Sequence, residues 1–512
     1  MNRLEINKLS TDPFDVVIVG GGINGSAAAQ QLAANGFRIL LIEKGDFAQG
    51  ATSKSSRILH CGLRHLTPGK SAWDFLFSPS TFLIACNNVY KSMQARTQVA
   101  HTMKELVRPF KFCFPIYKNG PYFPWQVDIA FLLLKILGPK NPPLDYIRYN
   151  KNNMDQVPFA RWMRDQDKLS GFAVFRDYQF LSAERLVIDT LIDSDRLGGI
   201  VRNYTQCHNA ERIGDMWELT LSDRISKEKV TVKTKLVINA AGPWGDLLNH
   251  KLTGDKQLRT VGLKGIHIIV QLPDELADQG MMTITRNHET IYCLPWHGLH
   301  YIGPTRTPYK DNLDDPNASS QEIQWVLDEI NHAMPEIALT KNQIFYSWAG
   351  IQPLTFDSSD AKGSRQVKIH DLSDIGAPDM LMLTGGPIIT YRIIAKKILK
   401  EVLKRIRPTA DKATVCYHAS EMSCKMFQGE NSESVLQMSE ELFKTIAKEE
   451  QIVNLSDLYL RRTELGWNQD RGLDSIKANA KIIAKILGWN KEEIQCQILN
   501  YKNKSGIFYG GL

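Results

Sequence analysis

The stretch 15–43 reads DVVIVGGGINGSAAAQQLAANGFRILLIE and decides the fold. Its apolar, β-branched start at 16–19 is typical of a buried parallel strand. The alanine-rich segment 27–34 favours a helix. A second apolar run at 39–42 ends at an acid, Glu43. The order strand, glycine turn, helix, strand predicts a Rossmann-like unit that binds a dinucleotide.

Each glycine of the G-x-G-x-x-G turn has a physical role. Gly20 allows the tight turn, Gly22 lets the backbone approach a pyrophosphate, and Gly25 lets the helix pack close to the strand. The helix N-terminus offers free N–H groups to the phosphates. Glu43 ends the second strand, where an acid accepts ribose hydroxyls and disfavours a 2′-phosphate. The residues of this unit predicted to contact the dinucleotide are Gly20, Gly22, Asn24, Gly25, Glu43 and Lys44.

Length and composition limit the remaining classes of protein. A chain of 512 residues is longer than one core usually holds, so we expect two or three domains. A net charge of +7 is too small over this length for a dedicated nucleic-acid binder. The eight cysteines contain no C-x-x-C pair, which favours reduced thiols in a cytoplasmic protein and no metal site. We see neither a signal peptide nor a membrane-spanning run.

The segment 44–66 after the second strand is rich in small hydroxylated residues. The hydroxyls of Thr52, Ser53 and Ser56 suit a diphosphate or a polar ring edge. Taken alone, the segment also fits an ordinary capped surface loop.

A series of short motifs carries a family resemblance. The segment 51–66, ATSKSSRILHCGLRHL, is similar to the segment that follows the nucleotide motif in FAD-dependent glycerol-3-phosphate dehydrogenases and glycerophosphate oxidases, where the pattern ends in H-G-G-x-R-Y-L. Further similar motifs follow in the family's order. They are NAAGPW at 239–244, KGIH at 264–267, IGPT at 302–305, GIQPL at 350–354, GGPIITYR at 385–392 and LSDLYLRRT at 455–463.

The resemblance and the chain pattern together predict an α/β fold, α+β overall. We expect a discontinuous Rossmann-like FAD-binding domain, an interleaved substrate domain with an antiparallel sheet, and a C-terminal all-α cap. Prolines should break residues 70–185 into short helices. The predicted boundaries are 14–70, 186–260 and 376–405 for the FAD-binding domain, 71–185 and 261–375 for the substrate domain, 406–432 for a linker and 433–505 for the cap.

The resemblance also implies further residues around FAD. A second glycine turn at the start of a helix, 385–390, would hold the flavin O2, where negative charge develops on reduction. A strand end near Cys207 would touch adenine. The additional residues expected at the cofactor are His60, Gly62, Cys207, Ala241, Gly242, Gly385, Gly386, Pro387, Ile388, Ile389 and Thr390.

The family reaction moves a hydride from C2 of sn-glycerol 3-phosphate to the flavin and gives dihydroxyacetone phosphate. A base must take the hydroxyl proton, and His60 and His267 are the candidates. Cations must hold the phosphate. The residues expected at the substrate are Arg64, His65, Lys264, Arg306, Gln352 and Arg392, with Arg64 and Arg306 also counted as catalytic.

The substrate motifs depart from the family pattern. Gln352 replaces an arginine, Pro387 a lysine and His65 a tyrosine, whereas Arg306 stands where the family has an acid. Because each charged hydrogen bond to a phosphate contributes roughly 1.5–3 kcal/mol, two lost cations would weaken phosphate binding strongly. Two alternatives therefore stay open: a flavoenzyme for another hydroxy acid, polyol or amine, and an FAD-holding scaffold without turnover.

The resemblance further implies a quinone as electron acceptor. The stretch 121–140, PYFPWQVDIAFLLLKILGPK, suits a helix lying in a membrane interface, and equally a buried helix of the substrate domain. We expect a cytoplasmic protein, with contact to the inner face of the cytoplasmic membrane in the first case. A homodimer is left open.

Overall fold

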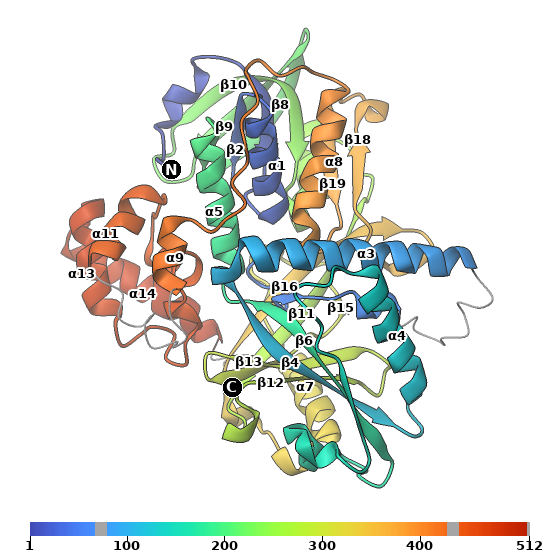
Figure 1. The fold of residues 1–512 in the computed structure, drawn as a ribbon. Coiled ribbons are helices and arrows are strands. Elements are labelled where there is room, and N and C mark those ends of the chain that lie inside the picture. The colour runs from blue at the N-terminus through green and yellow to red at the C-terminus, as the bar shows by residue number, and fades with distance from the viewer. Residues whose placement is uncertain (67–78, 428–439, 509–512) are drawn as a thin grey trace.

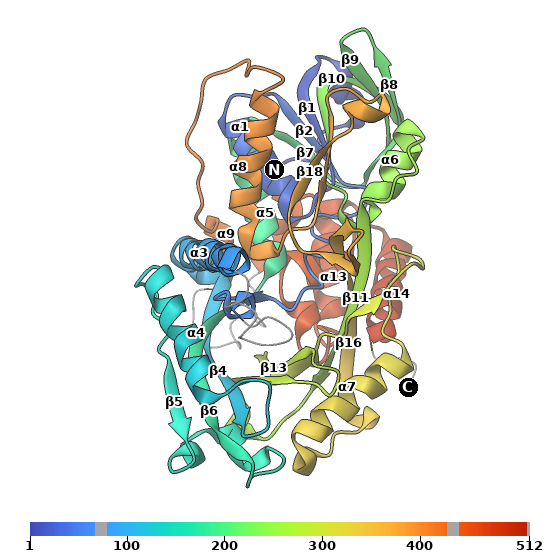
Figure 2. The ribbon, with the colours of Figure 1, turned by 90° about the vertical axis from the view of Figure 1, so that its right-hand side faces the viewer.

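Two β-sheets and a helical cap make up the protein. The computed structural model describes residues 1–66, 79–427 and 440–508. The first sheet lies above the second, and the C-terminal helices pack at one side of both (Figure 1). Helix α3 (Pro79–Thr102) runs across the molecule at the level between the two sheets (Figure 1), with α4 (Pro124–Leu137) beside it (Figure 2). This mixed architecture confirms the predicted fold class.

The first sheet contains the predicted strand–turn–helix–strand unit. Its strands run in the order β18-β19-β10-β1-β2-β7, and β8 and β9 form a hairpin that continues from β10. From β19 to β7 the neighbouring strands are parallel, with Val17 opposite Leu40 and Val237. The strands are β1 (Phe14–Val19), β2 (Ile39–Ile42), β7 (Ile200–Arg202), β8 (Thr205–Ile213), β9 (Met216–Asp223), β10 (Lys229–Asn239), β18 (Lys368–Asp371) and β19 (Met380–Thr384).

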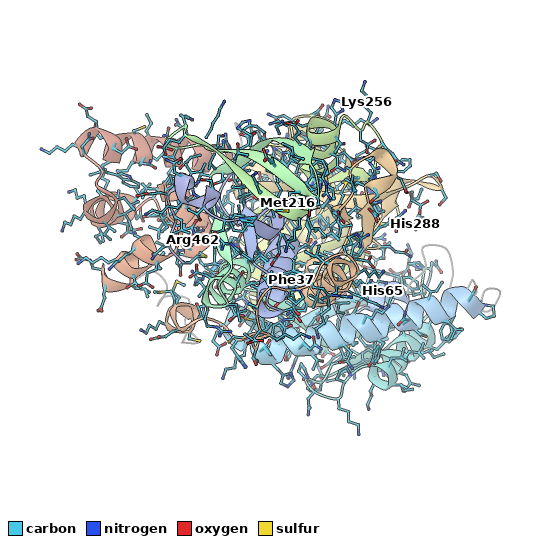
Figure 3. The ribbon with its side chains drawn as sticks, turned by 90° about the horizontal axis from the view of Figure 1, so that it is seen from above. Phe37, His65, Met216, Lys256, His288 and Arg462 are labelled. Carbon is cyan, nitrogen blue, oxygen red and sulfur yellow. The ribbon has the colours of Figure 1, made fainter. Side chains whose placement is uncertain are left out.

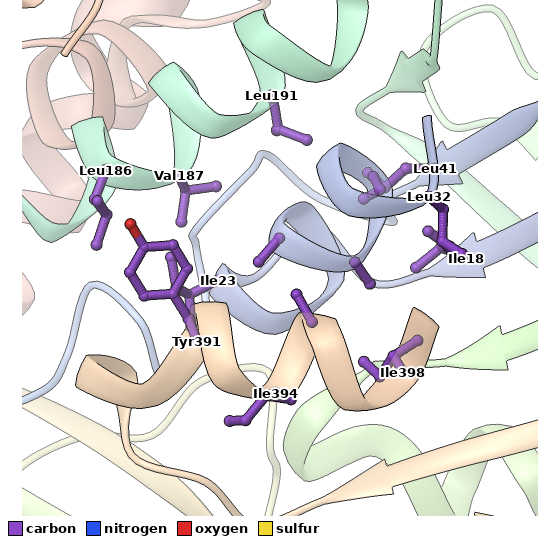
Figure 4. Close-up of a cluster of buried hydrophobic side chains, with 14 of the residues drawn as sticks. Ile18, Ile23, Leu32, Leu41, Leu186, Val187, Leu191, Tyr391, Ile394 and Ile398 are labelled. Atoms are coloured by element: carbon purple, nitrogen blue, oxygen red, sulfur yellow. The ribbon is translucent and has the colours of Figure 1, made fainter. Parts of the chain in front are cut away.

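Helix α1 (Ile23–Ala34) is buried almost all round because helices pack on both sides of it. Helices α5 (Ala183–Arg196) and α8 (Tyr391–Leu403) flank it, and apolar side chains of all three meet (Figure 4). The alanines of α1 allow these close approaches. A helix enclosed in this way needs no single apolar stripe, which explains its uniform, alanine-rich sequence.

The second sheet is mainly antiparallel. Its order is β17-β16-β11-β14-β13-β12-β4-β6-β3, with β15 on β11 and β5 on β6. Helix α7 (Ser320–Ala333) packs on it. The strands are β3 (Ile58–Leu59), β4 (Val107–Tyr117), β5 (Ile147–Asn150), β6 (Leu169–Phe180), β11 (Thr260–Val270), β12 (Gln279–Ile284), β13 (Thr290–Trp296), β14 (Leu299–Gly303), β15 (Thr307–Pro308), β16 (Ile344–Asp357) and β17 (Asp360–Ser364).

The prediction that residues 70–185 form only short helices is wrong. The described part contains the 24-residue helix α3 and the long paired strands β4 and β6. Aromatic residues pair across these strands; Phe112 stacks on Phe175 with ring centroids 5.3 Å apart. Such cross-strand packing outweighs the breaking tendency of the prolines in β4.

Three elements fall on the other side of the predicted domain boundaries. Strand β18 pairs with β19 in the first sheet, and β3 pairs with β6 in the second. Helix α9 (Glu421–Phe427), within the predicted linker, packs into the cap core through Met426. Pairing and packing partners distant in sequence decide these assignments. Residues 67–78 and 428–439, which the predicted boundaries also assign, lie outside the described residues.

The cap is helical, as its apolar spacing predicts. It comprises α9, α11 (Glu440–Glu449), the short α12 (Leu455–Asp457) with the π-helical turn Leu458–Arg462, α13 (Ile476–Leu487) and α14 (Lys491–Phe508). Besides its own core, the cap extends Trp467 into the core of the second sheet. The cap is therefore built into the body of the protein.

Candidate active site

A cavity of 1840 Å³ lies between the two sheets. One end is walled by the glycine turn of the first sheet, and the other by strands β11 and β16 of the second. The cap contributes Asn454, Ser456, Leu460, Arg461 and Trp467 to its wall.

The glycine turn leaves room for a ligand at one position. A Cβ atom at Gly20 would lie 2.5 Å from the carbonyl oxygen of Ala240, and one at Gly25 would lie 2.0 Å from that of Gly20. Both glycines are thus required by backbone contacts. At Gly22 a Cβ would meet only the Thr52 hydroxyl, at 3.4 Å, so this backbone is open to the cavity. The start of α1 faces the same space.

Glu43 is fixed at the end of β2. Its two carboxylate oxygens accept hydrogen bonds from the amides of Gly21 and Gly45, each at 2.8 Å. Burial raises the pKa of Glu43, against these two bonds. The neighbouring Lys44 pairs with Asp314 from the second-sheet side and lies 4.4 Å from the ring centroid of Trp244. The nucleotide end is therefore assembled from both halves of the protein.

Most residues predicted to hold the cofactor line this one cavity. Gly25, Gly62 and Gly385 are the exceptions, and each has a packing role. At Gly385, with φ of +70°, a Cβ would lie 2.3 Å from the carbonyl oxygen of Gln366. The lining residues are Gly20, Gly22, Asn24, Glu43, Lys44, Thr52, Ser53, Ser56, His60, Cys207, Ala241, Gly242, Gly386, Pro387, Ile388, Ile389 and Thr390.

The strands β11 and β16 form the floor of the cavity at the end away from the glycine turn. This end is named the substrate end after its predicted role. His267 pairs with Trp348, Gly265 with Gly350, and Leu263 with Gln352. Alternate residues of a strand point to the same face, so these three pairs share one face. All six residues line the cavity.

His267 is buried and held on three sides. Its ring stacks on Trp348, with centroids 4.9 Å apart, and Tyr301 meets it edge-on. Its Nε2 lies 3.1 Å from the Ser56 hydroxyl, and its buried Nδ1 has no hydrogen-bond partner among the described residues. Burial, followed by the charge of Arg57, lowers the pKa of His267 to about 3. The imidazole is therefore neutral at physiological pH.

His60, His65 and Arg306 also line the cavity. The ring of His60 lies 5.7 Å from that of Tyr292, and His65 Nε2 lies 3.4 Å from the Ser92 hydroxyl. The side chain of Arg64 lies outside the described part. The structure thus brings both candidate bases and one predicted cation to the same space.

Lys264 and Arg392 do not line the cavity. Lys264 is adjacent to floor residues in β11, so it points to the opposite face, where it pairs with Glu322 at 2.8 Å. Arg392 donates to the hydroxyls of Tyr391 and Thr102 at 2.7 and 2.8 Å, within the helical layer. Strand alternation and helix packing account for both positions, and neither residue is proposed as a substrate ligand.

Several lining residues were absent from the predicted set. Tyr292 and Trp348 come from strand interiors, where an aromatic residue is ordinarily core. Lys54 lies in the serine-rich loop, and burial lowers its pKa to about 7. Trp348 lies two residues before the motif GIQPL at 350–354, outside the residues that the motif indicated. The cap residues Ser456, Leu460 and Arg461 lie in the motif 455–463, but the motif does not indicate that they reach the cavity, because their place depends on how the cap docks.

Taken together, the parallel sheet, the glycine turn and the enclosed second sheet define the class of dinucleotide-binding oxidoreductases. The particular family is shown by comparison with known proteins. The profile of the family DAO, FAD dependent oxidoreductase, matches residues 15–387, and the chain belongs to this family.

Individual relatives agree with this assignment. The chain is 29% identical over 422 residues to a glycerol-3-phosphate dehydrogenase of Synechocystis sp., covering 79% of this chain and 72% of the relative. Among solved structures, it resembles the glycerol-3-phosphate dehydrogenase from Bacillus halodurans complexed with FAD, with a TM-score of 0.74, 18% identity and coverage of 99% and 97% of the two chains. It also resembles glycine oxidase from Geobacillus kaustophilus, with a TM-score of 0.55, 19% identity and coverage of 80% and 99%.

The residues present fit FAD, which is the cofactor of this family. The backbone at Gly22 is open where a pyrophosphate would approach. The side-chain oxygen of Asn24 and the indole nitrogen of Trp244 are buried with no partner among the described residues, and both side chains line the cavity. A cavity of 1840 Å³ with polar groups along its length can accept an elongated dinucleotide.

Proposed function

We propose that the protein oxidises sn-glycerol 3-phosphate at C2 to dihydroxyacetone phosphate and passes the electrons to a quinone. The names of the relatives supply the substrate class. The observation that carries the proposal is the buried His267, whose Nδ1 has no partner among the described residues, on the floor of the cavity whose other end holds the dinucleotide turn. When bound, FAD accepts the hydride.

The chain's own residues would handle the proton and exclude water. A neutral imidazole can accept the C2 hydroxyl proton as the hydride leaves. Ser56 and Trp348 fix the orientation of His267 by a hydrogen bond and by stacking. His60 is a second candidate for the same proton, since it lines the same cavity. The buried floor keeps water from the reacting carbon.

Arg306 is the proposed ligand of the phosphate. It lines the cavity, and its buried Nε has no hydrogen-bond partner among the described residues. Gln352 and Pro387, which replace two cations of the family pattern, also line the cavity. The phosphate would therefore rely on Arg306, with Arg64 as a further proposed partner, rather than on residues at 352 and 387.

Anaerobic reduction of the bound flavin tests the proposal. The purified holoenzyme is mixed with sn-glycerol 3-phosphate without oxygen, and the flavin absorbance near its visible maximum is followed. Bleaching, with dihydroxyacetone phosphate as the product, supports the proposal. A protein that stays oxidised with this substrate and bleaches with none of a panel of hydroxy acids, polyols and amines is the non-catalytic scaffold.

A second candidate is the oxidation of a substrate without a phosphate group. The uncharged Gln352 and Pro387 on the cavity wall favour it. Bleaching by a hydroxy acid, polyol or amine but not by glycerol 3-phosphate supports this candidate. The double variant Pro387→Lys, Gln352→Arg separates the two: it should raise activity on glycerol 3-phosphate if the pocket has only lost cations. No increase would indicate a rebuilt pocket.

We also propose that α4 rests on a membrane surface, where a quinone would be reached. One face of α4 packs into the second-sheet core through residues such as Phe131 and Leu134. The opposite face exposes large apolar side chains, with Leu132 55% and Ile136 67% exposed. An apolar exposed face of this kind marks an interaction surface. No helix of the described residues has the length and apolar character needed to span a bilayer.

Vesicle co-sedimentation tests this surface. The protein with Leu132→Ser and Ile136→Ser should lose binding to phosphatidylethanolamine–phosphatidylglycerol vesicles. Ile213→Ser, on β8, is the matched control because Ile213 is 51% exposed. Equal binding by all three proteins would contradict membrane contact through α4. A homodimer stays a prediction, and light scattering of the same sample tests it.

A further inference from the structure

The C-terminal cap reaches the nucleotide end of the cavity, although the family match ends at residue 387. Its segment 450–463 packs against β7, the edge strand of the first sheet. Gln451 donates to the carbonyl of Val201 at 2.8 Å, and the carbonyl of Gln451 accepts from the Asn203 side chain at 2.8 Å. Asn454, Ser456 and Arg461 of the same segment line the cavity.

Asp46 joins this cap segment to the loop that follows Glu43. The guanidinium of Arg462 bonds both carboxylate oxygens of Asp46, each at 2.8 Å. Arg461 Nε donates to the same carboxylate at 2.5 Å, and the Asn203 amide donates at 2.9 Å. Asp46, Arg461 and Arg462 are all buried. Figure 3 shows Arg462 at the boundary between the cap helices and the first-sheet domain.

Tyr204 forms a second tie between the cap and the nucleotide loops. Its hydroxyl donates to Asp457 at 2.7 Å and accepts from the Asn454 amide at 2.7 Å. The backbone amide of Tyr204 donates to the carbonyl of Gly45 at 2.8 Å, and that of Thr205 donates to the carbonyl of Glu43 at 2.7 Å. The two loops, 43–46 and 203–205, are thus bonded to each other and to the cap.

These contacts affect how much order FAD must impose when it binds. Both loops line the adenosine side of the cavity through Glu43, Lys44, Tyr204 and Thr205. A loop that is already held in its bound shape loses little conformational entropy on binding, whereas a loose loop loses much more. Bidentate arginine–carboxylate pairs in a buried setting fix geometry particularly well.

We propose that the cap segment 454–462 is part of the FAD site. Asp457, Arg461 and Arg462 act as positioning residues that hold the loops 43–46 and 203–205 in the shape that receives the adenosine end. Because coupling between two equilibria is reciprocal, bound FAD in turn secures the docked cap.

The contacts of Asp46 and Tyr204 with the cap segment 454–462 are called the cap seam below. A seam that serves stability alone gives different measurements from one that positions the loops. If the cap only adds stability, then seam variants lower the unfolding temperatures of apoprotein and holoprotein alike and leave the FAD dissociation constant unchanged. If the seam positions the loops, then the dissociation constant rises even where the apoprotein stays folded. The affinity for FAD, measured apart from activity, therefore decides between the two.

The mildest test removes one hydroxyl. Tyr204→Phe loses the bonds to Asp457 and Asn454. Tyr459→Phe is the matched control, since among the described residues the Tyr459 hydroxyl bonds Ser475 and Asn479, both inside the cap. Apoprotein is titrated with FAD, and quenching of flavin fluorescence gives the dissociation constant. We expect Tyr204→Phe to weaken binding about threefold to tenfold and the control to stay within about twofold. Equal values for both variants would overturn the proposal.

The stronger test alters the ion pairs. Asp46→Asn and Arg462→Lys should each weaken FAD binding roughly tenfold or more, because both lose the bidentate geometry. Arg96→Lys, which disturbs the buried Arg96–Asp177 pair of the substrate half, is the control. Unchanged FAD affinity in folded Arg462→Lys protein would contradict the proposal.

Hydrogen exchange of the unaltered protein tests the reciprocal effect and does not depend on a variant folding. FAD should slow amide exchange in the cap segment 454–463 as well as in the glycine turn 20–25. Helix α13, within the same cap but away from the seam, is the internal control. Slowing in the glycine turn without any change in 454–463 would overturn the proposal.

Discussion

The two ends of the cavity are built in different ways. At the nucleotide end, backbone groups form much of the cavity wall: the open Gly22, the amides that bind Glu43 and the start of α1. At the substrate end, side chains form the wall, and the register of β11 and β16 brings His267 and Gln352 together there. The first end follows from one continuous stretch, whereas the second depends on pairing between distant strands.

This difference teaches where substitution is tolerated. A backbone site constrains few residue types beyond its glycines. A side-chain site depends on the residue type at each of its positions, and Gln352, Pro387 and Arg306 are such positions on the cavity wall. The fold and cofactor of the family can therefore be retained while the substrate changes.

The largest expected effect is on the reaction rate, and it comes from a substitution at the substrate end, His267→Gln. His267→Gln should lower the rate of anaerobic flavin reduction by about 10²–10⁴-fold, because it removes the proton acceptor. The FAD dissociation constant, measured on the same protein, should stay within about threefold of the original, since His267 belongs to the other end. A loss of FAD affinity comparable to the loss of rate would break the comparison.

The core behind the substrate end should respond to pH. Burial raises the pKa of Glu464 to about 8, and His297, whose own pKa burial lowers to about 3, lies 3.3 Å from it. A folded pKa above the unfolded one means that stability is full below about pH 4.5 and falls as pH rises to about 8, by about 2–4 kcal/mol between pH 5 and pH 8. Denaturant unfolding of Glu464→Gln should show a flatter profile. If the free energy of unfolding had the same slope against pH in both proteins, Glu464 would not be the group responsible.

Substitution of Arg306 tests the proposed phosphate site. Arg306→Met should raise KM for glycerol 3-phosphate by about 10- to 150-fold, because one charged hydrogen bond to the phosphate is lost. Arg212→Met is the control, since Arg212 pairs with Asp379 on the first sheet. Steady-state kinetics gives both values. An unchanged KM would mean that other residues bind the phosphate, or that the substrate has no phosphate group.

Gly22 tests the nucleotide end by itself. Gly22→Ala should weaken FAD binding roughly tenfold or more, because its methyl group occupies the space of the pyrophosphate. The apoprotein should unfold within about 2 °C of the original, since the new Cβ lies 3.4 Å from the Thr52 hydroxyl, an ordinary van der Waals distance. Isothermal titration and thermal scans measure the two quantities. Full FAD affinity in this variant would place the diphosphate elsewhere.

The smallest kinetic effect is expected at Lys264. Lys264→Met should leave KM within about twofold, because the side chain points away from the cavity. Stability should fall by about 1–3 kcal/mol, since Glu322 loses its charged partner and keeps its hydrogen bonds to Ser319. A large increase in KM would mean that the face of β11 carrying Lys264 contacts the substrate.

Local patterns predicted the elements whose stability is local. The alanine-rich segment 27–34, which was predicted to be helical, lies within α1, where the helix propensity of each residue acts locally. The strands and glycine turn of 15–43 form as expected. In contrast, β4 and β6 were missed, because aromatic pairing across strands has no signal within either strand alone.

The amino-acid sequence by itself determined the dinucleotide turn, the family and most of the predicted cofactor residues that line the cavity, since these depend on backbone geometry over short spans. The tertiary structure alone decided that Lys264 and Arg392 face away from the cavity and that the cap reaches the loop of Asp46. The physical reason is that strand register, helix packing and domain docking set the direction of a side chain through contacts between residues far apart in the chain.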